Sequence, residues 1–179
     1  MNDFTLHTVE TAPEQSKPLL EASIKAFGML PNLHGVMATS PSNLKAYQQL
    51  HEAFLNTSFN AEEKTVVWQA INVEHGCHYC VPAHSAIADS MKVDKTINQA
   101  LRDKQPLKDE KLKTLRTVTL ELVRERGHLS DTSKKAFFEA GYSHQHLLDI
   151  IVGIAQKVMS NYVNHLADTP VDDAFKAYL

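Results

Sequence analysis

The sequence predicts an all-helical protein. Apolar residues recur three or four positions apart along nearly every segment, whereas no convincing alternating pattern of a half-buried strand is found. Serine, asparagine and aspartate, which favour the N-cap of a helix, stand before several of these segments. The 179 residues hold no internal repeat, low-complexity tract or clear linker. We therefore expect a helical bundle with a single domain over residues 1–179.

Capping residues and glycine breaks predict where each helix begins and ends. Ser40 before Pro41 supplies an N-cap and a proline at the first helical position, and Asn60 with Glu63 forms an expected capping box. Asp94 is the expected cap of a shorter helix. Glycines at positions 28, 76, 127 and 141 separate helices. The expected helices span residues 14–27, 33–38, 41–55, 61–74, 77–90, 95–103, 109–126, 131–140 and 145–167.

The last long helix, residues 145–167, carries apolar residues around most of its circumference. They are Leu147, Leu148, Ile151, Val152, Ile154, Ala155, Val158, Met159, Tyr162, Val163 and Leu166. Such a helix lies inside a bundle or is covered by a partner subunit. We expect a homo-oligomer, although a central core helix explains the pattern nearly as well.

Composition excludes several classes of partner. The net charge is −3, and lysines and arginines are spread along the helices, so nothing favours nucleic-acid binding. No apolar run approaches the roughly 18 residues that span a membrane, and the first residues lack the pattern of a signal peptide. We expect a cytoplasmic protein without a bound cofactor, in which a Cys-x-x-Cys motif is more often catalytic than structural.

Both cysteines of the chain fall in one motif. Cys77 and Cys80 are three residues apart, and His84 follows four residues later. On a helix these three side chains share one face, and the two cysteines lie within the range that a disulfide bridges. The arrangement suits reversible thiol–disulfide chemistry with a base beside it.

Other kinds of site also use two cysteines and a histidine. A structural disulfide across so short a loop stabilises by at most roughly 1–2 kcal/mol. A c-type haem site needs histidine directly after the second cysteine, where Val81 stands. A zinc site is the stronger alternative, with two thiolates and His84 as ligands, in a helical module that is not an enzyme. Its fourth ligand would come from His75, His78, His51 or His165.

The surroundings of the motif suggest how a thiolate is generated. Gly76 places the cysteines in the first turn of their helix, where unpaired backbone amides favour an anion. We expect His84 to take the thiol proton or to stabilise the thiolate. Glu74 lies on the apolar face of the preceding helix, where burial would raise its pKa and where it would hydrogen-bond His84. Of His78 and Tyr79, one is expected to line the site, and Tyr79 is the expected neighbour of the leaving oxygen.

The motif also carries a resemblance to a known family. Residues 72–85, NVEHGCHYCVPAHS, resemble the signature of the alkyl hydroperoxidase D (AhpD)/carboxymuconolactone decarboxylase-like family, in its peroxidase-related subgroup. Shorter matching pieces are LPNL at 30–33, SP at 40–41, AGY at 140–142 and SNYVNH at 160–165. The resemblance implies an all-helical fold assembled as a trimer, hexamer or other homo-oligomer. It also implies antioxidant reduction of hydroperoxides, with electrons from an external dithiol or a redox adaptor protein.

The resemblance implies a role for each motif residue. Cys80 attacks the peroxide, Cys77 resolves it to a disulfide, and His84 belongs to a glutamate–histidine–thiol proton relay. The AhpD type has its relay glutamate where Thr65 stands here, and a histidine where Tyr79 stands. Glu74 matches the glutamate of a Glu-x-x-Cys variant instead. The alternative within the family is a lactone decarboxylase, which would leave both cysteines unexplained.

Overall fold

The computed structural model describes residues 3–179, which contain helices joined by short turns and no strand. The predicted all-helical class is confirmed. The elements are α1 (Lys17–Phe27), α2 (Asn32–Met37), α3 (Pro41–Leu55), α4 (Ala61–Glu74), α5 (Cys80–Ser90), α6 (Lys95–Arg102), α7 (Glu110–Arg124), α8 (Asp131–Glu139), α9 (His144–Ala167) and the 3₁₀ helix η1 (Asp173–Tyr178). None of the helices within this range is long and apolar enough to span a membrane.

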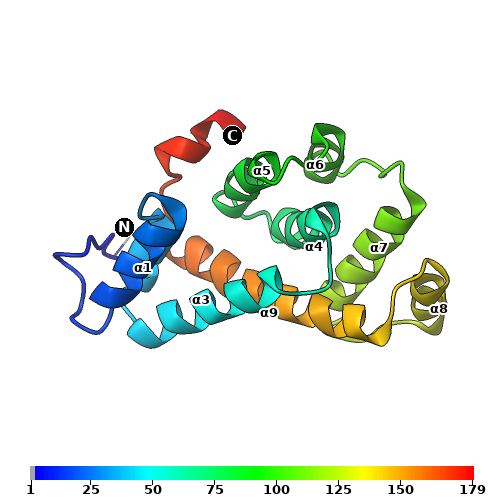
Figure 1. Cartoon of the computed structure of the whole chain (residues 1–179), viewed down its shortest axis with the longest axis horizontal. Coiled ribbons are helices and arrows are strands. Elements are labelled where there is room, and N and C mark those ends of the chain that lie inside the picture. Colours follow the sequence, from blue (N-terminus) through cyan, green and yellow to red (C-terminus); the bar gives the residue numbers. More distant parts are fainter. Residues whose placement is uncertain (1–2) are drawn as a thin grey trace.

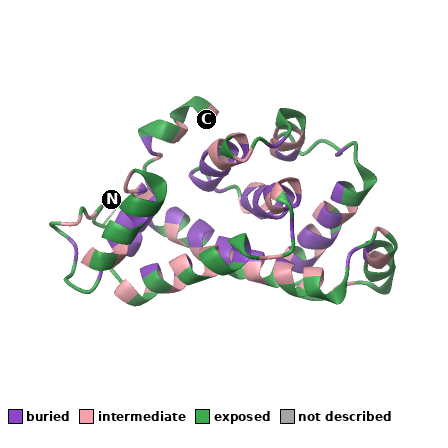
Figure 2. Cartoon of the chain, in the orientation of Figure 1, coloured by how far each residue is buried: buried purple, intermediate pink, exposed green. Residues whose placement is uncertain are grey.

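Two helices organise the bundle (Figure 1). Helix α9 is the longest, runs along most of the molecule, and packs against α2, α3, α4 and α5. Helix α4 lies in the middle, between α9 on one side and α5, α6 and α7 on others. Most residues of α4 are buried (Figure 2). The motif helix α5 therefore packs against both of these helices.

The N-caps account for the agreement between predicted and observed helix starts. The Ser40 hydroxyl accepts a hydrogen bond from the Asn43 backbone amide, so α3 begins at the next residue. Asn60 and Glu63 form the predicted capping box, and the Asp94 side chain caps α6. These side chains satisfy backbone amides that have no partner within the helix.

The apolar core has two parts. The larger one surrounds Trp68 and includes Phe54, Leu115, Phe137 and Ile150, from helices α3, α4, α7, α8 and α9. The second includes Leu20 and Leu44 from α1 and α3, Leu33 from α2, and both cysteines. The thiols thus belong to the interior of the protein and not to its surface.

One element was not predicted. After α9 the chain turns back, and η1 packs against α5 (Figure 1). The Tyr178 hydroxyl donates to Asp89 at 3.0 Å, and Phe175 packs edge-on against the Tyr79 ring. The C-terminal segment therefore lies along the motif helix, from its N-cap Tyr79 to Asp89 in its last turn.

Candidate active site

The turn between α4 and α5 sets the positions of the two cysteines. Gly76 has a φ of +61°, which glycine adopts without strain, and the Cys77 amide then donates to the Asn72 carbonyl at 3.0 Å. Cys77 lies before the helix, whereas Cys80 is its first residue. The prediction that both cysteines occupy the first helical turn is therefore wrong for Cys77. Its sulfur instead accepts the Cys80 backbone amide at 3.2 Å, as a cap would.

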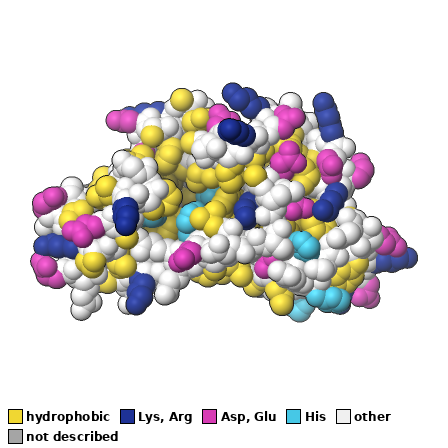
Figure 3. Space-filling model, in the orientation of Figure 1, with side chains coloured by type: hydrophobic (Ala, Val, Ile, Leu, Met, Phe, Trp, Pro, Cys, Tyr) yellow, Lys and Arg dark blue, Asp and Glu magenta, His cyan; other side chains and the backbone are white. Residues whose placement is uncertain are grey.

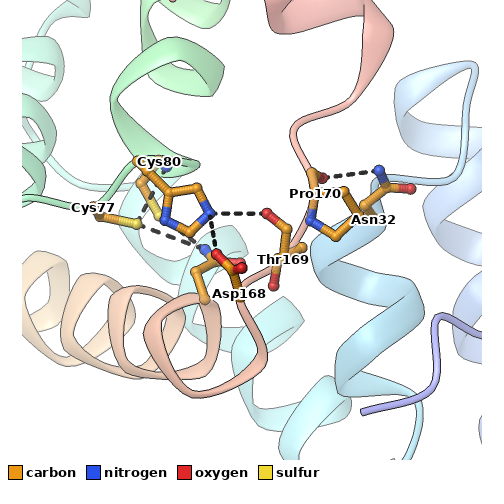
Figure 4. A network of polar contacts seen from close by, with 8 residues as sticks. Asn32, Cys77, Cys80, Asp168, Thr169 and Pro170 are labelled. Carbon is orange, nitrogen blue, oxygen red and sulfur yellow. Dashed lines mark hydrogen bonds and ion pairs between the residues drawn. The ribbon is translucent and has the colours of Figure 1, made fainter. Parts of the chain in front are cut away.

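Both thiols are enclosed and contact side chains of α9. Cys77 is 0% exposed and Cys80 is 1% exposed. The Asn164 amide donates to the Cys80 sulfur at 3.1 Å and lies 3.8 Å from the Cys77 sulfur, while the Ser160 hydroxyl is 3.9 Å from the Cys80 sulfur. Figure 4 shows the two cysteines together, beside the segment from Asp168 to Pro170 that leaves α9.

These contacts shift the pKa values of the two thiols in opposite directions. Burial raises the pKa of Cys80, but the Cys77 thiol, the Lys157 ammonium and the amides of Asn161 and Asn164 outweigh it, so the net shift is downward. Hydrogen bonding to Cys80, together with burial, raises the pKa of Cys77. Of the two thiols, Cys80 is therefore the more acidic and Cys77 the less acidic.

Lys157 is the cation of this site, and the sequence analysis did not identify it. It is 1% exposed, and its amine lies 2.8 Å from His84 Nε2. A lysine ammonium only donates, so His84 accepts through Nε2. Burial first, and then the charge of Lys157, lower the pKa of His84 well below its ordinary value. His84 is thus a neutral ring that holds Lys157, not an imidazolium beside the thiol.

Glu74 does not join His84. Both of its carboxylate oxygens accept hydrogen bonds from the Arg124 guanidinium at 2.7 Å. The Arg124 hydrogen bonds outweigh partial burial and lower the pKa of Glu74. The predicted contact with His84 and the predicted rise in pKa are both wrong, because a guanidinium of α7 is within reach at the end of α4. At Thr65 the hydroxyl donates to the Ala61 carbonyl, so that position supplies no carboxylate either.

Tyr79 is the residue between the cysteines that points inward. Its hydroxyl donates to Asp172 at 2.5 Å and accepts the Leu33 amide at 3.3 Å. Burial, followed by the Asp172 carboxylate, raises the pKa of Tyr79. The neighbouring His78 is half-exposed at its side chain, and its Nε2 lies 2.9 Å from the Thr169 carbonyl. The phenol is therefore tied to the segment that precedes η1.

A cavity of about 270 Å³ opens onto Cys80, His84 and Lys157, while Cys77 does not line it. Its aromatic walls are Phe27, Tyr47, Tyr79 and Phe175, and His34 and His51 complete the lining on one side. The face shown in Figure 3 is hollowed near its middle, where hydrophobic side chains and histidine atoms gather. The site is thus an apolar cavity with the more acidic thiol, Cys80, and a buried lysine, Lys157, at its wall.

The remaining histidines of the cavity are neutral. Burial, then the electrostatic interaction with the nearby His51, lowers the pKa of His34 to about 3, and burial, then the charge of Lys157, lowers the pKa of His51 to about 4. Within residues 3–179, no three side chains of histidine, cysteine, aspartate or glutamate converge as metal ligands. The zinc alternative therefore has no ligand set in the described part of the chain.

Comparison with known proteins places this geometry in a known fold. No protein-family model and no curated protein matches the sequence. The structure is similar to the alkylhydroperoxidase AhpD core of an uncharacterized peroxidase-related protein from Ralstonia eutropha JMP134, with a TM-score of 0.85 and 18% identity over 96% of this chain and 93% of that one. The protein has the AhpD-like fold.

Two further structures share the AhpD-like fold. An uncharacterized peroxidase-related protein from Silicibacter sp. TM1040 matches at a TM-score of 0.80 and 16% identity, over 97% of this chain and 92% of that one. The debrominase Bmp8, as a cysteine-to-alanine variant in complex with 2,3,4-tribromopyrrole, matches at 0.77 and 20% identity, over 92% and 89%. The resemblance that the motif indicated is thus confirmed for the fold.

Within this AhpD-like fold, the polar residues of α9 were the main omission of the sequence analysis. Gln156, Lys157, Ser160, Asn161 and Asn164 are all buried. They recur at spacings of three and four residues, so they share one face. The sequence did contain a signal for them: polar residues recur at helical spacing in a helix that is predicted to be buried. Buried polar groups need partners, so such a pattern indicates a polar site.

Proposed function

We propose that the protein is a thiol-dependent hydroperoxide reductase. One observation carries the proposal: the only thiol at the wall of the cavity, Cys80, is also the one whose pKa is lowered. A thiolate is the form that attacks an oxygen–oxygen bond. The second thiol, Cys77, lies next to Cys80 in the same turn, where it can lose its proton and attack the sulfenic acid.

The proposed reaction has three balanced steps. The Cys80 thiolate attacks one oxygen of R–O–OH, giving Cys80 sulfenic acid and, with one proton, the alcohol ROH. Cys77 condenses with the sulfenic acid to form a disulfide and release water. An external dithiol, free or carried by a redox adaptor protein, then reduces the disulfide and is itself oxidised.

The side chains around the sulfur have distinct proposed roles. Lys157 stabilises the thiolate and, through its charge, the alkoxide that leaves. His84 positions Lys157 through the 2.8 Å hydrogen bond. Tyr79 supplies an inward-facing hydroxyl at the cavity wall. Glu74, paired with Arg124, has no part in the relay.

The test is hydroperoxide consumption in the presence of a dithiol. Cys80→Ser is expected to abolish turnover, whereas Cys77→Ser retains a hydroxyl donor and is expected to allow one attack, leaving a sulfenic acid that a dimedone reagent traps. If Cys77→Ser blocks the first attack and Cys80→Ser does not, the two roles are reversed. Consumption unaffected by either substitution contradicts the redox function.

A second candidate function is reductive debromination of an aromatic compound. It is favoured by the similarity to the debrominase Bmp8 and by the aromatic cavity walls. The cysteine pair would supply two electrons, converting Ar–Br and two thiols into Ar–H, HBr and a disulfide. Bromide release from a bromopyrrole, measured beside hydroperoxide consumption, decides between the two candidates.

We also propose a cytoplasmic homo-oligomer built on α9. Leu148, Ile151, Tyr162 and Leu166 are exposed along this helix, with between 43% and 73% of each residue accessible. A second copy covering this stripe would bury it. Light scattering at micromolar concentration tests this, and a monomeric mass contradicts it. The cytoplasm is proposed because a Cys-x-x-Cys motif that is catalytic and not structural is typical of a reducing compartment.

A further inference from the structure

A chain of hydrogen bonds fixes the proton of His51. The Trp68 indole donates to the Gln156 side-chain oxygen at 2.8 Å. An indole N–H only donates, so this contact assigns the Gln156 oxygen and leaves its NH₂ group on the other side. That NH₂ group lies 2.8 Å from His51 Nδ1 and also hydrogen-bonds the Tyr47 hydroxyl. His51 Nδ1 therefore accepts, and the proton of the ring is on Nε2.

The Nε2–H group of His51 is free to bind a ligand. His51 lines the cavity together with Cys80 and Lys157. Within residues 3–179, the His51 ring hydrogen-bonds other side chains through Nδ1 and not through Nε2. Because the pKa of His51 is lowered to about 4, the ring is neutral at physiological pH and presents a donor without adding a charge.

The residues that hold the His51 ring are buried. Trp68 and Gln156 are 1% and 0% exposed, and the His51 ring stacks on Trp68 with ring centres 6.0 Å apart. A donor that is held in place before the reaction stabilises developing negative charge without reorganisation. A neutral histidine that donates to a substrate oxygen is a known arrangement in enzymes of other folds.

We propose that His51 Nε2–H, together with the Lys157 ammonium, forms an oxygen-binding subsite that holds the leaving oxygen of an organic hydroperoxide against the Cys80 thiolate. This inference rests on the proposed function and adds the residue that orients the substrate. When the thiolate attacks the distal oxygen, charge develops on the oxygen attached to carbon. Two N–H donors at the same cavity wall would stabilise that alkoxide until it takes a proton.

The walls of the cavity define the class of hydroperoxide. Phe27, Tyr47 and Phe175 surround the space beside the donors. A cavity of about 270 Å³ accepts a compact aromatic or branched organic group, and pockets lined by apolar side chains with a few polar groups select ligands of that kind. We expect cumene hydroperoxide to be a better substrate than hydrogen peroxide, which fills only a small part of the cavity.

The first experiment measures the proton of His51 and requires no activity. The ring nitrogens of ¹⁵N-labelled full-length protein are observed by NMR at neutral pH, with the His51→Gln spectrum identifying the His51 signals. The expected result is protonation at Nε2 only. Protonation at Nδ1, or at both nitrogens, overturns the inference whatever the enzyme does.

The second experiment compares His51→Leu with His51→Gln, whose amide can still donate. His51→Leu is expected to lower kcat/KM for cumene hydroperoxide about a hundredfold, and His51→Gln is expected to recover most of that loss. The rate of Cys80 alkylation by iodoacetamide should stay within about twofold of wild type in both, because the thiolate does not depend on this donor.

The results of these experiments distinguish a failure of the oxygen-binding subsite from a failure of the proposed function. Equal losses in alkylation and turnover would assign His51 a structural role and overturn the subsite. Equal activity of His51→Leu and wild type would overturn it as well. If wild type consumes no hydroperoxide, the proposed function and the oxygen subsite both fail, and the NMR result then shows only whether the donor exists.

Discussion

The two halves of α9 differ in what they bury. In the first half, Ile150 is fully buried in the larger core, and Gly153 allows the Phe54 and Val67 side chains to approach the helix. In the second half, the buried face is polar and surrounds the thiols. Its members are Gln156, Lys157, Ser160, Asn161 and Asn164. One helix thus serves as a core element at one end and as a wall of the candidate active site at the other.

The packing of the two halves is therefore specified by different kinds of interaction. Apolar packing is non-directional, so the first half depends mainly on volume and shape. A buried polar group without a partner costs about 1–3 kcal/mol, so each residue of the second half needs a particular neighbour. Asn161 shows this: its oxygen lies 2.9 Å from His75 Nδ1, and its NH₂ group donates to Asn72 at 3.1 Å.

The largest expected effect is on stability, in the apolar half. Ile150→Ala removes a fully buried side chain, so we expect the free energy of unfolding to fall by about 2–5 kcal/mol. Because Ile150 contacts neither thiol, the alkylation rate of Cys80 should not change while the protein is folded. Urea denaturation and iodoacetamide kinetics check the two statements. A changed alkylation rate would show that the halves are not independent.

The next effect is on chemistry, in the polar half. Lys157→Met removes the ammonium that lowers the pKa of Cys80, so we expect hydroperoxide turnover at neutral pH to fall about a hundredfold. Raising the pH should restore part of the rate, since the thiolate then forms without the cation. Thermal stability should also fall, because the buried His84 Nε2 loses its hydrogen-bond partner. A pH-independent loss would contradict this role.

Gly153→Ala tests how tightly the apolar half is packed. A Cβ atom there would lie 2.7 Å from the Phe54 ring and 2.9 Å from Val67. Such overpacking costs about 1–3 kcal/mol, partly offset by the better helix propensity of alanine, about 1 kcal/mol. We expect a net loss of roughly 1 kcal/mol in urea denaturation. A stabilised variant would mean that Phe54 moves aside freely.

The smallest effect is expected at Glu74. Glu74→Gln breaks a half-exposed ion pair with Arg124, which is worth below about 1 kcal/mol. Arg124 lowers the pKa of Glu74, so this contribution is present above the ordinary carboxyl pKa and is lost as pH falls through the folded-state pKa. Turnover should match wild type. A tenfold or larger loss of kcat would restore Glu74 to the relay.

The sequence predicted the features that depend on local patterns. Ser40, Asn60 and Asp94 cap helices as expected, because caps act within one turn of chain. Periodicity alone did not reveal the partners of Glu74 or His84. These come from residues 50 and 73 positions away, and a single sequence does not contain that pairing.

The C-terminal segment shows a second limit of the sequence. Asp172 accepts the Asn32 backbone amide at 3.0 Å and the Tyr79 hydroxyl at 2.5 Å. Both partners lie far away in the chain, and η1 is too short for a periodic pattern to emerge. Phe175, which lines the cavity, was missed for this reason.

The central claim is that Cys80 is a preformed thiolate, and the most direct test is a thiolate titration. Ultraviolet thiolate absorbance is followed against pH in reduced wild type, with Cys80→Ser as the control that leaves only Cys77. We expect wild type to keep one thiolate well below the ordinary cysteine pKa of about 8.5, and the control to keep none. A wild-type titration at or above that ordinary value would show that Cys80 is not a preformed thiolate.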